Sequence, residues 1–345
     1  MTFGMVGSGS WGTALVKILT EGGHKVHWCL RSTKMIEQVR HRRHNPNYLS
    51  SVHLNTSLLE LTTEPSDVFR YADVILIAVP SAYVVDMLSG VDGSVISGKK
   101  ILSAVKGILP QENLLLNDYL AARFSFPLQD YLTVMGPCHA EEVASEKLSY
   151  LTFSGIDEAF TEEIAQYFST PYINTVVNTD IIGVQFAAVL KNIYALGAGI
   201  AHGLEYGDNF LSVFIANCAD EMAGFLQKSG IRNIEVGTHE YSADIHHRKS
   251  PNYAASVYLG DLLVTCYSPF SRNRTFGNMI GKGYSVKAAQ LELNMVAEGY
   301  NASRCIHEIN FHLNATMPIA DAVYRILWEQ LPAEIGMKKV EQTLI

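Results

Sequence analysis

The chain opens on Phe3-Gly4-Met5-Val6-Gly7-Ser8-Gly9-Ser10-Trp11-Gly12, a short apolar run that leads into a glycine-rich turn. The glycines have the G-x-G-x-x-G spacing that lies between a strand and a helix in dinucleotide-binding folds. In that setting Gly7 makes the tight turn, Gly9 lets the backbone approach a pyrophosphate, and Gly12 lets the helix pack on the strand. The helix N-terminus then offers free N–H groups to the anion. This context favours dinucleotide binding over a plain turn.

Segments typical of strands and helices alternate through the rest of the first half. Helices are predicted over 12–20 and 32–43, and the second is closed by Asn45-Pro46-Asn47. The run at 73–79 is continuously apolar, as expected of a parallel strand covered on both faces. This alternation predicts an α/β domain built on a Rossmann-type, doubly wound parallel sheet. The other predicted strands are 25–30, 100–105 and 131–135, with 150–153 and 172–177 as further edge strands.

After Asp180 the pattern changes to long segments of helical periodicity. Asn178-Thr179-Asp180 supplies side chains that cap helices well. The sequence therefore predicts two domains, an NAD(P)-binding Rossmann domain over 1–180 and an all-α substrate-binding and catalytic domain over 181–345. The predicted helices of the second half are 181–201, 210–229, 285–297 and 303–313.

Composition bounds the class of protein. The chain has 345 residues, of which 48% are hydrophobic and 17% charged, and its formal net charge is −8. This balance excludes a disordered or fibrous chain, and it argues against nucleic-acid binding, which needs clustered cations. The five cysteines form no C-x-x-C pair, and the N-terminus has no recognisable signal peptide. We therefore expect a reduced, cytoplasmic protein.

Residues 181–204 form a long apolar stretch whose only charged residue is Lys191. A lysine in the middle of a membrane span would cost about 2.5–3.5 kcal/mol, so a buried helix is favoured and no membrane span is expected. Because burying an unpaired ammonium group is costly, Lys191 should either lose its proton or lie beside an anion. Either state suits a general acid or base, or an anion-binding group. The alternative is a lysine that reaches the surface.

The second predicted strand ends without the acid that selects NAD in many dinucleotide-binding folds. Residues 27–32 contain no Asp or Glu, and Arg31 lies where a 2′-phosphate would be met. A basic run follows over 34–44, with Glu37 as its one acid. Both NADP and NAD stay open, so the predicted cofactor is NAD(P).

Two further segments suit a small anionic ligand. Ser271-Arg272-Asn273-Arg274 concentrates hydrogen-bond donors, and a guanidinium group meets phosphate oxygens in a bidentate fork. The Gly136–Glu142 loop follows a predicted strand, at the edge where open α/β sheets bind ligands. His239, His246 and His247 match no zinc spacing, so no metal site is expected.

Together these motifs resemble the bacterial-type NAD(P)-dependent sn-glycerol-3-phosphate dehydrogenases. The match runs from Gly7 to about Ser303, and several ordered motifs at compatible spacing are more specific than any one of them. The resemblance implies a Rossmann-type domain followed by an α-helical domain of the 6-phosphogluconate dehydrogenase C-terminal-like kind. Besides the glycine-rich turn, the matching motifs are Asn-Pro-Asn-Tyr-Leu at 45–49, Ala-Val-Pro-Ser at 78–81, Val-Lys-Gly at 105–107, Gly-Pro-x-x-Ala-Glu-Glu-Val at 136–143, Leu-Lys-Asn at 190–192, Gly-Asp-Leu-Leu-Val-Thr-Cys at 260–266, Ser-Arg-Asn-Arg at 271–274 and Val-Ala-Glu-Gly at 296–299.

The resemblance also implies roles for individual residues. Lys191 would be the catalytic general acid/base, and Lys106 would be a second catalytic residue that adds positive potential at the reacting oxygen. Position 138 is usually serine in this family, and residues 231–252 look longer than the usual connection. The implied cofactor contacts are Gly7, Gly9, Ser10, Trp11, Gly12, Arg31, Lys106, Ala140, Arg272, Val296 and Glu298. The implied substrate contacts are Lys106, Gly136, Cys138, Lys191, Asp261, Ser271, Arg272 and Asn273.

The implied activity is reversible hydride transfer between a nicotinamide and the secondary carbon of glycerol 3-phosphate. It would reduce dihydroxyacetone phosphate and supply phospholipid synthesis, and a homodimer is compatible with the sequence. Two other hypotheses stay open. A related two-domain dehydrogenase of carboxylate-bearing hydroxy acids would not need the donor cluster at 271–274. A nucleotide-sensing protein without catalysis would have no reason to bury Lys191.

Overall fold

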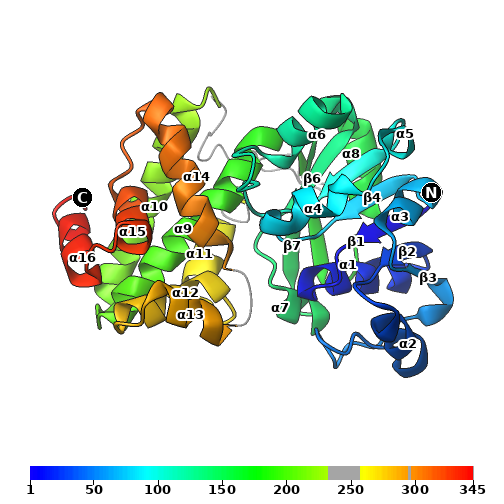
Figure 1. Cartoon of the computed structure of the whole chain (residues 1–345), viewed down its shortest axis with the longest axis horizontal. Coiled ribbons are helices and arrows are strands. Elements are labelled where there is room, and N and C mark those ends of the chain that lie inside the picture. Colours follow the sequence, from blue (N-terminus) through cyan, green and yellow to red (C-terminus); the bar gives the residue numbers. More distant parts are fainter. Residues whose placement is uncertain (232–256, 294–296, 345) are drawn as a thin grey trace, which may run out of the picture. The chain divides into compact units, whose positions relative to one another are not determined.

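The structure is a computed structural model, and it describes residues 1–231, 257–293 and 297–344. The chain divides into two units, Met1–Ile181 and Ile182–Ile345, which run from blue to green and from green to red in Figure 1. Unit 1 combines strands with helices, whereas the described part of unit 2 consists of helices and their connections.

Unit 1 holds a single eight-stranded sheet. Its strands are β1 (Phe3–Val6), β2 (Val26–Cys29), β3 (Leu59–Thr62), β4 (Val74–Ile77), β5 (Lys100–Ser103), β6 (Tyr131–Met135), β7 (Ser149–Gly155) and β8 (Ile173–Asn178). Their order in the sheet is β3-β2-β1-β4-β5-β6-β7-β8. β1 to β6 are parallel, while β7 is antiparallel to β6 and parallel to β8. The order reverses between β1 and β4, and open sheets bind ligands at such a switch point.

Helices cover both faces of this sheet, as the side chains of β1 show. The helices are α1 (Ser10–Glu21), α2 (Thr33–Arg42), α3 (Pro65–Tyr71), α4 (Val84–Ser89), α5 (Gly93–Ile96), α6 (Leu116–Phe124), α7 (Ala140–Ala144) and α8 (Glu158–Gln166). Phe3 and Met5 point to one face, where they join a core cluster with side chains of α1, α2, α7 and α8. Gly4 points to the other face, where a Cβ would meet the Val68 side chain of α3.

The predicted α/β fold class is confirmed, with two differences in detail. Residues 150–153 belong to β7, which is not an edge strand because it lies between β6 and β8. The sequence also gives no sign of β3. This strand has four residues, none of them fully buried, and it pairs with β2 alone, so it lacks the apolar run that marks the inner strands.

Unit 2 is helical throughout its described part, as predicted. Its helices are α9 (Ile181–Gly203), α10 (Asp208–Lys228), α11 (Gly260–Tyr267), α12 (Arg272–Gly281), α13 (Val286–Leu293), α14 (Glu298–Leu313), α15 (Pro318–Trp328) and α16 (Ala333–Glu341). α14 begins earlier than the predicted start at 303. The end of the helix predicted over 285–297 includes residues 294–296, which lie outside the described residues. Most of the connection at 231–252 lies outside them too, and so do its three histidines.

By length and composition α9 could cross a membrane, but 89% of its most apolar window is buried inside the structure. Glycines let its neighbours approach closely. A Cβ at Gly277 of α12 would meet the carbonyl oxygen of Leu196, and a Cβ at Gly199 would meet that of Arg274. The backbones of α9 and α12 are therefore in contact where the two helices cross. This contact gives a packing reason for the glycines in an otherwise apolar helix.

A groove of about 740 Å³ lies where α14 ends and α15 begins. Its lining includes the apolar side chains of Ile306, Phe311 and Met317 together with His307 and Asp321.

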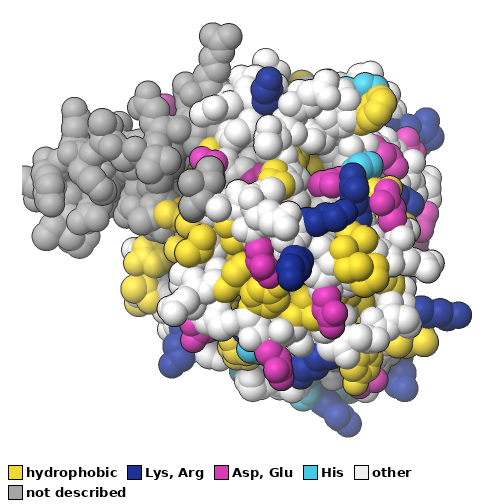
Figure 2. All heavy atoms as spheres, turned by 90° about the vertical axis from the view of Figure 1, so that its left-hand side faces the viewer, with side chains coloured by type: hydrophobic (Ala, Val, Ile, Leu, Met, Phe, Trp, Pro, Cys, Tyr) yellow, Lys and Arg dark blue, Asp and Glu magenta, His cyan; other side chains and the backbone are white. Residues whose placement is uncertain are grey.

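On the face of the molecule shown in Figure 2, hydrophobic side chains gather in several groups among acidic and basic ones. Apolar atoms make up more than half of an ordinary protein surface, so these groups by themselves identify no partner.

A buried carboxylate holds the start of α15. Glu221 of α10 accepts hydrogen bonds from the backbone N–H groups of Ile319 and Ala320, at 2.8 and 2.9 Å. These groups belong to the first turn of α15, where the backbone has no partner within the helix. Burial raises the pKa of Glu221 to about 7, although the two hydrogen bonds oppose the shift.

We expect Glu221 to reduce the free energy of unfolding as the pH rises. Its ordinary pKa is 4.5, so between about pH 4.5 and 7 the folded state binds the proton more tightly than the unfolded state does. Below about pH 4.5 the protonated carboxyl group contributes its whole stabilisation. As the pH rises to about 7, the free energy of unfolding falls by about 3 kcal/mol. Glu221→Gln cannot titrate. In denaturant titrations the wild type should therefore lose about 3 kcal/mol relative to the variant across that range, and a constant difference would contradict the assignment.

Candidate active site

The glycine-rich turn after β1 has the geometry of a dinucleotide-binding loop. Gly7 has a φ of +133°, and a Cβ there would lie 2.6 Å from the carbonyl oxygen of Ala78, which follows β4. A Cβ at Gly12 would meet the Gly7 carbonyl group. At Gly9, by contrast, no heavy atom of the described residues beyond its chain neighbours lies within 4 Å of such a Cβ. The protein's own packing requires Gly7 and Gly12, whereas the space beside Gly9 is open to a ligand.

The first turn of α1 is suited to an anion. Gly9 is the N-cap of this 12-residue helix and has no side chain that could accept from its first N–H groups. Ser10 and Trp11 follow in that first turn, and the helix dipole adds positive potential there. The turn lies at the switch point between β1 and β4. These residues therefore fit the pyrophosphate of an NAD(P) molecule.

Asn45, in the segment that follows α2, forms hydrogen bonds to the glycine-rich turn and to α1. This role could not be predicted from the sequence. Asn45 Nδ2 donates to the Ser8 carbonyl oxygen at 3.0 Å and to Thr13 Oγ1 at 2.8 Å, and the residue is fully buried. Its Oδ1 accepts from the backbone N–H groups of Asn47 and Tyr48. In the sequence this asparagine is recognisable only as the end of a helix and as part of a motif. Its partners Ser8 and Thr13 are distant in sequence, so no local pattern could reveal the contact.

The first turn of α1 and the loops after β5 and β6 bring together four of the predicted residues of unit 1. Lys106 Nζ lies 5.3 Å from the centroid of the Trp11 ring and 3.9 Å from Cys138 Sγ. Cys138 Sγ donates to the Gly136 carbonyl oxygen at 3.1 Å. Gly136 has a φ of +127°, and a Cβ there would lie 2.6 Å from the Tyr150 carbonyl oxygen, so the turn after β6 requires glycine. A cation, an indole and a thiol thus meet beside the glycine-rich turn.

Two other predicted cofactor residues of unit 1 lie elsewhere on the same unit. Arg31 is exposed just after β2, and its guanidinium carbon is 6.0 Å from the centroid of the Tyr48 ring. Ala140 is buried and is the first residue of α7. The end of β2 therefore presents a guanidinium group, which is suited to a 2′-phosphate.

The central feature of unit 2 is a buried ion pair between Lys191 of α9 and Asp261 of α11, whose side chains are 4% and 2% exposed. Lys191 does not reach the surface, and the anion that its burial requires is Asp261. Thr265 Oγ1 donates to the Asp261 carbonyl oxygen at 2.6 Å and lies 3.4 Å from Asp261 Oδ1. Asp261 Oδ2 is buried and has no hydrogen-bond partner among the described residues. A carboxylate this close to a buried amine is the partner that an ammonium group needs when it is withdrawn from water.

A buried amide link lies beside this ion pair. Asn273 Nδ2 donates to Asn192 Oδ1 at 2.9 Å, and Asn273 Oδ1 accepts from the Gly299 N–H at 3.0 Å. Asn192 directly follows Lys191, and Gly299 directly follows Glu298 in the first turn of α14. Asn273 therefore connects α9, α12 and α14, a contact that its predicted place at the substrate does not include.

The other predicted residues of unit 2 lie at helix starts. Ser271 is the buried N-cap of α12, and its Oγ accepts from the Arg274 N–H at 3.3 Å. Arg272 is the exposed first residue of the same helix. Glu298 is the half-buried first residue of α14, whereas Val296 lies outside the described residues. An exposed guanidinium group at a helix N-terminus suits a phosphate group.

The described residues contain no group of three or more His, Cys, Asp or Glu side chains that could hold a metal ion. All five cysteines are free thiols. The glycine-rich turn of unit 1 is suited to a dinucleotide, and unit 2 offers a buried lysine paired with a carboxylate, together with donors for an anion.

Comparisons with known proteins agree with this chemistry. Residues 2–161 and 180–338 match the family models of the N-terminus and C-terminus of NAD-dependent glycerol-3-phosphate dehydrogenase. A glycerol-3-phosphate dehydrogenase [NAD(P)+] of Bacillus subtilis is 31% identical, over 97% of this chain and 92% of the relative. One of Chlorobium chlorochromatii is 30% identical, over 96% and 95%. The crystal structure of glycerol-3-phosphate dehydrogenase from Coxiella burnetii superposes with a TM-score of 0.84 at 25% identity, covering 98% of both chains.

Proposed function

Because the chain belongs to the NAD-dependent glycerol-3-phosphate dehydrogenase family, we propose that it reversibly reduces dihydroxyacetone phosphate to sn-glycerol 3-phosphate with NAD(P)H. The observation that carries the proposal is the buried ion pair of Lys191 and Asp261, in the same unit as the donors at the start of α12. An ion pair withdrawn from water adds little to stability by itself, which points to a role in chemistry.

The glycine-rich turn and the first turn of α1 would hold the cofactor. Backbone N–H groups of Ser10 and Trp11 would meet its pyrophosphate in the open space beside Gly9. Arg31 would meet the adenosine ribose or its 2′-phosphate. The chemistry that the bound cofactor would supply is a hydride for the secondary carbon of the substrate, or an acceptor for that hydride in the reverse direction. The further cofactor contacts in the proposal are Gly7, Gly12, Lys106, Ala140, Arg272, Val296 and Glu298.

The substrate would be held by its phosphate group at the start of α12. Arg272 can form a bidentate pair with phosphate oxygens, and Ser271 and Asn273 add polar groups from the same turn. Gly136 and Cys138 are further substrate contacts in the proposal. Binding at the start of α12 would remove water from the phosphate group, and the hydrogen-bond donors there would compensate for that lost hydration. The net charge of the whole chain matters less than these local groups.

Lys191 would manage the proton. In the reducing direction its ammonium group would give a proton to the carbonyl oxygen as that oxygen gains negative charge, and in the oxidising direction the neutral amine would take it back. Asp261 would stabilise the charged form and orient the amine. Lys106 would add positive potential at the same oxygen.

Free thiols at all five cysteines suit a reducing compartment, and we place the reaction in the cytoplasm, where it would supply phospholipid synthesis. The net charge of −8 argues against a nucleic-acid partner. We include a homodimer in the proposal, and light scattering of the purified protein would measure the number of chains in the particle.

The test is to follow the absorbance of NADH and NADPH with the purified chain and dihydroxyacetone phosphate. We expect turnover with this substrate and none with a panel of 2-keto acids. Faster reduction of a keto acid would favour a hydroxy-acid dehydrogenase, and cofactor binding with no turnover would favour a nucleotide sensor. The ratio of the two rates measures the preference between NAD and NADP.

A further inference from the structure

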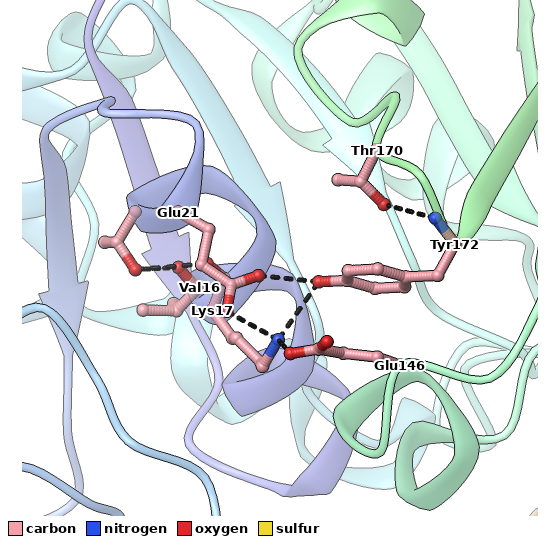
Figure 3. Close-up of polar contacts among 7 residues, drawn as sticks. Val16, Lys17, Glu21, Glu146, Thr170 and Tyr172 are labelled. Atoms are coloured by element: carbon pink, nitrogen blue, oxygen red, sulfur yellow. Dashed lines mark hydrogen bonds and ion pairs between the residues drawn. The ribbon is translucent and has the colours of Figure 1, made fainter.

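A buried lysine that the proposed chemistry does not use lies on the dinucleotide-binding helix. Lys17 of α1 has a side chain only 6% exposed, and its Nζ reaches three oxygen atoms, as Figure 3 shows. It lies 2.6 Å from Glu21 Oε1, 3.1 Å from Glu146 Oε1 and 3.0 Å from the Tyr172 hydroxyl. The three N–H groups of the ammonium can therefore all be paired.

The contacts close into a ring. The Tyr172 hydroxyl accepts a hydrogen bond from Lys17 Nζ and donates one to Glu21 Oε2 at 2.6 Å. The other carboxylate oxygen, Glu21 Oε1, forms an ion pair with Lys17 Nζ. Burial lowers the pKa of Lys17, but the hydrogen bonds to Glu21, Tyr172 and Glu146 outweigh burial and raise it. The ammonium group therefore stays charged and holds its partners throughout the physiological range.

Together with the contact between Lys17 and Glu146, the ring joins three segments that are distant in the sequence. Lys17 and Glu21 lie in the last turns of α1, Glu146 lies just after α7, and Tyr172 lies just before β8. Glu146 has a φ of +57°, in the left-handed region that non-glycine residues seldom occupy. Its N–H also donates to the Val143 carbonyl oxygen, which fixes the exit of α7. The contact with Lys17 thus ties an unusual backbone conformation to α1.

The N-terminal ends of α1 and α7 lie at two loops of the candidate site, whereas Lys17 and Glu146 lie near their C-terminal ends. α1 begins at the glycine-rich turn, and α7 begins directly after Cys138 and His139. α7 packs against α1, and Figure 1 shows the two helices side by side. At the loops Lys106 contacts both Trp11 and Cys138. Lys17 lies six residues beyond Trp11, about 9 Å along the helix, so the pair of helices is joined near both ends.

We infer that Lys17 is a positioning residue, which through Glu146 sets the separation between the glycine-rich turn and the 136–140 loop. This inference rests on the proposed function only for the identity of the ligand, an NAD(P) molecule. Without the contact, α7 would shift against α1, and the loop that carries Cys138 would move relative to the pyrophosphate site. The effect would be on cofactor affinity and on the KM of the cofactor, and kcat would change little.

Lys17→Met tests the inference, because methionine keeps the length and the apolar stem of the side chain and removes its charge. We expect the Kd of NADPH, measured by nucleotide fluorescence without substrate, to rise about 10-fold, and the KM of NADPH to rise in parallel. Glu146→Gln keeps an acceptor and should raise both values less. Lys17→Arg keeps the charge and several donors, and it should recover most of the affinity. The matched control is Lys147→Met, which removes an exposed charge next to Glu146 and should leave the Kd unchanged.

A structural role alone would give a different result. If Lys17→Met lowers the melting temperature but leaves the Kd and KM of NADPH at wild-type values, Lys17 is not a positioning residue. An equal effect of Lys147→Met would also overturn the inference, because the change would then come from net charge. Failure of the proposed function would give a different result: the wild type would bind NADPH but not reduce dihydroxyacetone phosphate. The Kd values of NADPH for the wild type and Lys17→Met would still test the role of Lys17.

Discussion

Lys191→Met is expected to lower kcat by about 1,000-fold or more, because it removes the proposed proton donor. It also leaves Asp261 as a buried, unpaired carboxylate, which should cost about 3–5 kcal/mol of unfolding free energy. The side chains are 4% and 2% exposed, so the carboxylate that remains is withdrawn from solvent. Steady-state kinetics and denaturant titration measure the two effects separately.

A second substitution separates loss of chemistry from loss of fold. Asp261→Asn, added to Lys191→Met, removes the unpaired charge and should restore most of the stability without restoring turnover. A Lys191→Met variant with more than about a tenth of wild-type kcat would contradict the role of Lys191, since a general acid contributes about 100-fold or more. A double variant that regains turnover would contradict it as well.

Gly9→Ala should weaken NAD(P)H binding about 10- to 100-fold and leave the fold intact. Gly9 has a φ of −79°, which alanine adopts freely, and a Cβ there meets no atom of the described residues within 4 Å beyond its chain neighbours. The new methyl group would occupy the space proposed for the pyrophosphate and interrupt its charge-assisted hydrogen bonds, which are worth about 1.5–3 kcal/mol each. Fluorescence titration with NADPH and a thermal melt measure affinity and stability.

Two other glycines provide the comparison. Gly12→Ala should destabilise the protein itself, because its Cβ would meet the Gly7 carbonyl group. Gly90→Ala should change neither property, since in the described part of the chain no heavy atom beyond its chain neighbours lies within 4 Å of a Cβ at that position, and it is remote from the turn in sequence. Unchanged NADPH affinity in Gly9→Ala would show that the pyrophosphate does not lie beside Gly9.

Much of the fold could be predicted because its signals are local. The apolar runs of the inner strands and the glycine spacing lie within a few residues of one another, and burial of β1 and β4 follows from them. β3 gave no such signal, because a short, half-exposed edge strand needs only one partner and no apolar run. The place of β7 inside the sheet depends on pairing with β8, which no periodicity encodes.

Residues of the candidate site divide in the same way. Local spacing predicts that Gly7, Gly9 and Gly12 act together, and the lone charge in an apolar stretch predicts that Lys191 needs a partner. The identity of that partner could not be read from the residues alone, because Asp261 lies on another helix. Asn45 and Asn273 belong to motifs of the sequence, but their hydrogen bonds join segments that meet only in the folded chain.

By itself, the sequence of this protein determined a strand, a glycine-rich turn and a helix for a dinucleotide, a helical second half, and a buried lysine within it. Only the tertiary structure decided that Asp261 neutralises Lys191, that Gly9 faces open space, and that Lys17 ties α1 to Glu146, 129 residues away. The physical reason is that backbone conformation and hydrophobic periodicity are properties of neighbouring residues. A buried charge, by contrast, takes its partner from whichever segment the packing of the core brings within hydrogen-bond distance.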